Sequence, residues 1–191
     1  ADLTKSLVHP YVPRFPRHVS YDLVLFGSWR RKGVYVGEKQ IASPGSYPVA
    51  GFNFAPMYNL NYKLRFGVSL DGVYDGSANV YTEDALVEYD AGSGSSRRKF
   101  LVPGIQNQLA LGLSGRAEYV MPFFTIGVGL GTNVLGRGNL RGLYQVFALK
   151  INVTRSSFLH IGYNLQDFQT PNYLMLGLGF RFHNKYPKVR H

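Results

Sequence analysis

The sequence predicts an all-β protein, an eight-stranded antiparallel up-and-down transmembrane β-barrel. Three observations predict it: long segments with an apolar residue at every second position, connections that alternate between long and short, and a second strand face of small residues and scattered ions. The length of 191 residues suits one domain. No apolar run approaches the ~20 residues that a membrane helix needs. A helical membrane protein is therefore excluded, whereas the mean hydropathy of −0.11 does not exclude a barrel, because alternation hides a lipid-facing surface from an average.

Eight segments alternate in this way, and none shows the period of a helix. In the clearest one, Ile126 and Val128 share the apolar face, and Gly127 and Gly129 lie on the other. The predicted strands cover residues 19–30, 48–60, 62–74, 105–120, 123–134, 143–155, 157–166 and 172–183.

The connections between these segments alternate in length. Tight turns are expected at Asn61, at Met121-Pro122 and at Ser156. The longer connections cover residues 31–47, 75–104, 135–142 and, shortest of the four, 167–171. Successive connections of an up-and-down barrel lie at opposite ends, so all tight turns meet at one end and all longer loops at the other. Outer-membrane barrels have this layout, with tight periplasmic turns and longer extracellular loops.

The chain divides into an extended N-terminal segment (1–18), the barrel (19–183) and a basic C-terminal tail (184–191). An even number of strands places both termini at the tight-turn end. The N-terminal segment lacks a charged region followed by an apolar one, so we expect a bacterial outer-membrane protein secreted through a signal peptide already removed.

Eight alternating strands also describe a soluble lipocalin-like barrel, in which Leu109, Ile126, Val128 and Leu176 would surround a hydrophobic ligand. Such a barrel needs a solvated outer face rich in charge. The non-apolar face here is mostly Gly, Ala, Ser and Asn with ions of both signs, which suits the narrow interior of a membrane barrel. We therefore predict an interior polar network of Asp22, Arg65, Asp71, Arg116, Glu118, Lys150 and Arg181.

Aromatic residues make up 15% of the chain and gather near strand ends. This distribution resembles the two interfacial girdles of a membrane barrel, although Tyr and Phe are also good strand formers in general. The predicted girdle residues are Tyr58, Tyr62, Tyr119, Phe123, Tyr144, Phe158, Phe180 and Phe182.

Two parts of the chain resemble a known family. Residues 63–77 (KLRFGVSLDGVYDGS) resemble the third strand and second loop, and residues 153–168 with 172–182 resemble the closing hairpin, of small outer-membrane proteins from Bacteroides-type bacteria. These proteins are described as acyloxyacyl-hydrolase or lipid A 3-O-deacylase related (PagL-like). The resemblance implies an eight-stranded barrel that, in active members, hydrolyses an acyl ester of lipid A.

Active members of that family use a His and a Ser two residues apart on the penultimate strand, followed by an Asn, and a Glu on the last strand. A hydroxyl nucleophile, an imidazole base and a carboxylate that orients the base are what ester cleavage needs. This chain departs from the pattern: Gly162 follows His160 at the serine position, Asn164 lies four residues on, and Met175 stands on a closing strand without an acid. We expect His160 to be a buried residue satisfied by polar groups of the barrel, and it is the one candidate for a catalytic base.

Basic residues account for the net charge of +10 and concentrate in the long connections. Arginine and lysine there could bind the anionic phosphates of lipopolysaccharide, and the alternative is an ordinary solvated loop surface. Scattered cations without a recognition helix argue against nucleic-acid binding. The candidate headgroup contacts are Arg31, Lys32, Lys39, Arg97, Arg98, Lys99, Arg137 and Arg141.

The histidines lack metal-ligand spacing and the chain has no cysteine, so we expect no metal ion and no cofactor. The sequence thus predicts a monomeric, non-catalytic surface protein that is structural or binds membrane lipids, lipopolysaccharide among them. Two alternatives stay open: a lipid A deacylase with a non-standard catalytic set, and the soluble lipocalin-like binder.

Overall fold

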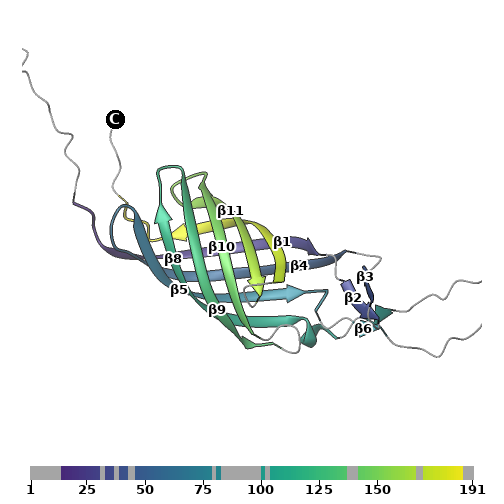
Figure 1. The fold of residues 1–191 in the computed structure, drawn as a ribbon. Coiled ribbons are helices and arrows are strands. Elements are labelled where there is room, and N and C mark those ends of the chain that lie inside the picture. The colour runs from purple at the N-terminus through teal and green to yellow at the C-terminus, as the bar shows by residue number, and fades with distance from the viewer. Residues whose placement is uncertain are drawn as a thin grey trace, which may run out of the picture.

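The computed structural model describes residues 14–30, 33–36, 39–42, 46–78, 81–82, 100–101, 104–136, 142–166 and 170–186. Eight long antiparallel strands close into a barrel in the order β1-β12-β11-β10-β9-β8-β5-β4 (Figure 1). Their bounds are β1 (His18–Arg30), β4 (Tyr47–Asn59), β5 (Leu64–Asp75), β8 (Leu109–Val120), β9 (Phe124–Leu135), β10 (Leu143–Asn152), β11 (Ser157–Gln166) and β12 (Thr170–Phe182). The predicted fold class is confirmed. No helix in the described part of the chain is long and apolar enough to cross a membrane.

The strand bounds follow the predicted segments closely, with two local differences. A short 3-10 turn, η1 (Ile105–Asn107), replaces the expected start of β8. At the end of β10 the strand stops at Asn152 instead of residue 155, because the Thr154 hydroxyl accepts hydrogen bonds from the backbone N–H groups of Ser156 and Ser157 and closes a turn.

Two small strand pairs lie in the long connections and were not predicted. They are β2 (Gly33–Val36) with β3 (Lys39–Ala42), and β6 (Tyr81–Thr82) with β7 (Phe100–Leu101). Each strand has four residues or fewer, too short for alternation to be recognised in the sequence. Figure 1 shows β2, β3 and β6 beyond the loop end of the barrel.

The tight turns lie together at the other end, as predicted. Asn61 shapes the turn between β4 and β5, since its side-chain oxygen accepts hydrogen bonds from the backbone N–H groups of Lys63 and Leu64, both at 2.8 Å. Residues 14–17, which precede β1, and residues 183–186, which follow β12, lie at this same end (Figure 1).

The apolar face of the strands points outward. The exposed fractions of Leu109, Ile126, Val128 and Leu176 are 48%, 47%, 48% and 50%. A soluble lipocalin-like barrel requires these side chains inside, so that alternative is wrong. The physical reason is space: the interior is filled by the polar side chains of the opposite parity, and the apolar row is left to face lipid.

The predicted aromatic girdle is only partly correct. Phe123 and Phe182 are exposed, whereas Tyr144 and Phe158 point into the barrel and are buried. Inward-facing glycines leave room for these two rings: a side chain at Gly112 would meet Tyr144, and one at Gly179 would meet Phe158. Strand parity, and not nearness to a strand end, therefore decides which aromatic residues can reach the membrane interface.

Candidate functional site

A cluster of ions crosses the lumen of the barrel around Asp22, which is buried on β1. Three cations from three other strands contact its carboxylate. Arg65 Nη2 of β5 lies 2.6 Å from Oδ2, Lys150 Nζ of β10 lies 2.8 Å from the same oxygen, and Arg181 Nε of β12 lies 2.9 Å from Oδ1. Only Arg181 stands directly beside Asp22 in the strand register.

Glu118, buried on β8, completes this cluster. Arg65 Nε donates a hydrogen bond of 2.6 Å to its Oε2, and Lys150 Nζ lies 2.7 Å from Oε1. Arg65 and Lys150 therefore each bridge both carboxylates, Asp22 and Glu118. We call these five residues, Asp22, Arg65, Glu118, Lys150 and Arg181, the cross-lumen cluster.

A second cluster surrounds the carboxylate of Asp71 on β5. Arg116 Nη2 lies 2.9 Å from both Asp71 oxygens, and the Tyr144 hydroxyl donates to Oδ2 at 2.6 Å. Neutral donors supply the remaining bonds. We call the set the Asp71 cluster; its members are Asn53, Ser69, Asp71, Ser114, Arg116 and Tyr144.

The two clusters contain all seven residues of the predicted interior network. Strand parity placed these seven on one face, and the same parity could have added Asn53, Ser69 and Ser114. Tyr144 was missed because it was assigned to the girdle. With Asp75, buried at the end of β5, the described interior holds four carboxylates against four Lys and Arg cations.

The side chains of the two clusters fill the lumen of the barrel. A buried charge is tolerated when it is paired and hydrogen-bonded, and each ion of the two clusters has an opposite partner. Two cavities, of about 30 Å³ and 20 Å³, lie among the described residues. Each has room for little more than a water molecule, so the arrangement is a filled barrel.

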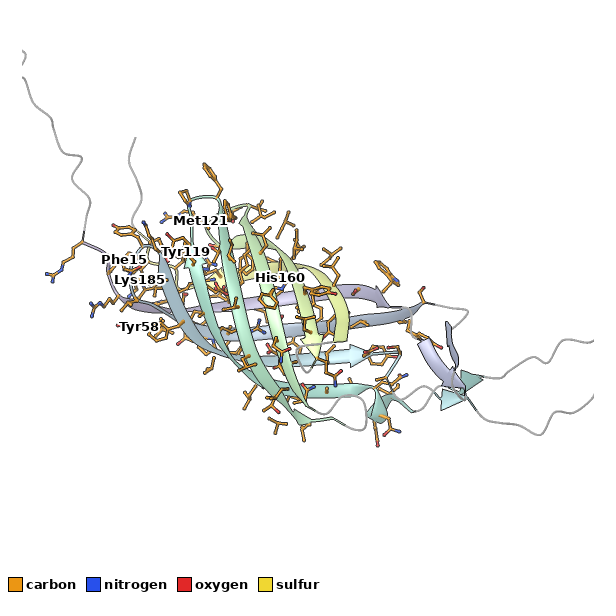
Figure 2. The ribbon with its side chains drawn as sticks, in the orientation of Figure 1. Phe15, Tyr58, Tyr119, Met121, His160 and Lys185 are labelled. Atoms are coloured by element: carbon orange, nitrogen blue, oxygen red, sulfur yellow. The ribbon has the colours of Figure 1, made fainter. Side chains whose placement is uncertain are left out.

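His160 points into the lumen from β11, with 3% of its surface exposed (Figure 2). It lines the smaller cavity with Lys150 and Arg116. We expected polar groups of the barrel to satisfy it, but neither ring nitrogen has a hydrogen-bond partner among the described residues. The expectation was wrong because Lys150, its register partner on β10, is engaged by Asp22 and Glu118 instead.

The outward face of the closing hairpin is apolar. Leu159, Ile161 and Tyr163 of β11 face outward, as do Leu174 and Leu176 of β12. None of these residues supplies a hydroxyl nucleophile beside an imidazole and a carboxylate. Among the described residues, no group of three His, Asp or Glu side chains could hold a metal ion.

The predicted headgroup contacts fall in the long connections. Arg31, Lys32, Arg97, Arg98, Lys99, Arg137 and Arg141 lie outside the described residues. Lys39 begins β3, and its side chain is not described. The flanking strand ends show only that all these connections leave and rejoin the barrel at the loop end.

Comparisons with known proteins bear on the whole barrel. The family model for "Acyloxyacyl hydrolase, C-terminal domain" matches residues 19–184. Among solved structures, Ail, the attachment invasion locus protein of Yersinia pestis, is 14% identical over 86% of this chain and 98% of that chain, with a TM-score of 0.45. Neisserial surface protein A (NspA) is 15% identical over 86% of this chain and 95% of that chain, with a TM-score of 0.39. No curated protein matches the sequence.

Proposed function

Because the chain belongs to the acyloxyacyl hydrolase C-terminal domain family, a PagL-like family of outer-membrane β-barrels, we propose that it is a non-catalytic member that contacts lipopolysaccharide through its loop end. The observation that carries the proposal is the orientation of His160: the imidazole that would act as base lies inside the barrel, whereas its acyl-chain substrate would lie outside.

The positions expected to hold the nucleophile and the acid of a hydrolase also lack the required groups. Gly162 occupies the position two residues after His160 and has no hydroxyl, and β12 carries no Asp or Glu from Asn172 to Phe182. Ser157, the nearest described serine in sequence, shares a hydrogen bond of 2.8 Å with the Thr154 hydroxyl in the turn between β10 and β11. Hydrolysis of an ester needs a nucleophile and a base within hydrogen-bond reach of one another. The hairpin of β11 and β12 does not supply that pair.

Two features support contact with lipopolysaccharide. The outward apolar rows of the eight strands are a surface for acyl chains. Beyond their loop end, the connections carry eight candidate cations, and arginine grips phosphate with two parallel hydrogen bonds. A lipid with several acyl chains and phosphates in its headgroup fits both features at once.

Binding can be tested with the loop cations. The variant in which Arg31, Lys32, Arg97, Arg98 and Lys99 are all changed to Gln should bind lipopolysaccharide vesicles at least tenfold more weakly than the unmodified protein, with no loss of folded barrel. The matched control removes five cations at the tight-turn end: Arg14, Arg17, Lys63, Arg155 and Lys185. Equal weakening by both variants would show that only total charge matters and would overturn the assignment to the loop end.

A second candidate function is hydrolysis of lipid A, favoured by the family and by the two unpartnered nitrogens of His160. Mass spectrometry of lipid A after incubation with the protein in vesicles separates the two functions. We expect every acyl chain to be retained. Loss of an acyl chain, abolished by His160→Ala, would replace the proposed function with the hydrolytic one.

A further inference from the structure

Among the residues that the structure describes, those at the tight-turn end of the barrel expose charge of a single sign. None of the described Asp and Glu side chains is exposed, because each belongs to the interior. The cations at this end lie on the surface instead, and no carboxylate of the described part of the chain pairs with them. They are Arg14, Arg17, Lys63, Arg155 and Lys185.

Aromatic packing brings the segments that carry these cations together. The ring of Phe15, beside Arg14, lies 4.8 Å from the ring of Tyr62 and 5.0 Å from that of Tyr186. These contacts join the segment before β1, the turn between β4 and β5, and the segment after β12. Figure 2 shows Phe15 and Lys185 at this end of the barrel.

Hydrogen bonds add the turn between β10 and β11 to the same surface. After β12 the backbone adopts a φ of 56° at His183, and the backbone N–H of Lys185 donates a hydrogen bond of 3.1 Å to Nε2 of His18. Arg155 Nη2 then donates to the carbonyl of Tyr186 at 2.7 Å, and Asn184 Nδ2 donates to the carbonyl of Arg155 at 2.9 Å. The five cations thus lie on one surface that these contacts hold together, and we call it the basic rim.

The basic rim adjoins residues that face the acyl chains of the membrane. Leu64 follows Lys63 directly, Val153 precedes Arg155 by two residues, and all three of Leu64, Val153 and Phe182 are exposed. An exposed apolar side chain one or two residues from an exposed cation places that cation at the depth of lipid headgroups. The turn between β8 and β9 has no cation and instead exposes Phe123.

We propose that the basic rim binds the phosphates of anionic phospholipids in the leaflet at the tight-turn end. A cation near an anionic membrane surface strengthens binding by about fivefold, so five on one surface suffice to select anionic over zwitterionic lipid. The site is distinct from the loop end, which holds the proposed contacts with lipopolysaccharide. An acidic segment of another protein is the rival occupant, and it is disfavoured because the apolar residues beside the rim suit acyl chains.

The test compares lipid selectivity in nanodiscs that contain phosphatidylcholine with a minority of phosphatidylglycerol. Lipids retained by the protein are counted by native mass spectrometry. We expect the unmodified protein to retain phosphatidylglycerol at least tenfold above its share, and the variant with all five rim cations changed to Gln to retain it near its share. A charge-conserving control, with Arg14, Arg17 and Arg155 changed to Lys, should retain phosphatidylglycerol as the unmodified protein does, because every positive charge of the rim is kept.

Single substitutions keep the test informative if the variant with all five rim cations changed to Gln folds poorly. Lys63→Gln alters one exposed side chain and should reduce the preference for phosphatidylglycerol by about fivefold. An unmodified protein without preference, or a rim variant that keeps the preference, would overturn the proposal. So would a soluble acidic peptide that binds the rim as tightly as phosphatidylglycerol does, which would assign the surface to a protein partner.

Discussion

The two charged clusters inside the barrel stabilise buried carboxylates in different ways. The cross-lumen cluster ties five strands together with two carboxylates and three cations, all buried. The Asp71 cluster surrounds one carboxylate mainly with neutral donors, has a single cation, Arg116, and borders the larger cavity through Asp71 and Tyr144. The difference indicates that the first cluster joins strands around the whole barrel through several ion pairs, whereas the second joins β4, β5, β8 and β10 through a single carboxylate.

The largest expected effect is at the centre of the cross-lumen cluster. Asp22→Ala leaves three cations facing a buried site from which their shared carboxylate is gone, and breaking a buried ion pair costs about 3–5 kcal/mol. Urea unfolding in lipid vesicles measures the loss, with Asp22→Asn as a size-matched control that should also be destabilising. A loss below about 1 kcal/mol for Asp22→Ala would contradict the role assigned to the cluster.

A smaller effect is expected at Asp71. Asp71→Ala removes the acceptor of several hydrogen bonds, but it strands only Arg116, whose side chain is 9% exposed. We expect a loss of about 2–3 kcal/mol, since hydrogen bonds to a charged group are individually worth about 1.5–3 kcal/mol and are not additive. The same unfolding experiment, run beside Asp22→Ala, ranks the clusters. A larger loss for Asp71→Ala would reverse the comparison.

Removal of one hydroxyl should cost less again. Tyr144→Phe keeps the ring that occupies the space beside Gly112 and deletes only the donor to Asp71. The expected loss is about 1–2 kcal/mol, and it should disappear in the Asp71→Ala background, because the bond is then already absent. Additive losses in this double-mutant cycle would show that the hydroxyl acts elsewhere.

The smallest effect is expected at His160. Its nitrogens have no described hydrogen-bond partner, so replacement by an apolar side chain removes an unsatisfied buried group and can be neutral or stabilising. His160→Leu should change the free energy of unfolding by less than about 1 kcal/mol. A loss above about 2 kcal/mol would instead show that a water in the adjoining cavity hydrogen-bonds to the ring.

Local patterns predicted most of the fold. The period of two located all eight strands and their lipid-facing rows, because a strand on a closed barrel presents only two faces. It also placed the seven interior ions. Strand parity shows which face a residue lies on, but not which residue of another strand it contacts. Nothing in the sequence pairs Asp22 with Lys150, 128 positions away, because that contact exists only after the barrel closes. The unpartnered nitrogens of His160 were missed for the same reason, whereas Tyr144 was missed because its place near a strand end was weighed above its parity.

Spin labels can show whether the apolar rows of the strands face lipid around a filled ionic interior. The chain has no cysteine, so single cysteines can be introduced at Leu109, Ile126, Val128 and Leu176 without background. In vesicles, labels at all four positions should be accessible to dissolved oxygen and protected from a water-soluble nickel reagent. Labels protected from both reagents would place these side chains inside the barrel and contradict the lipid-facing orientation.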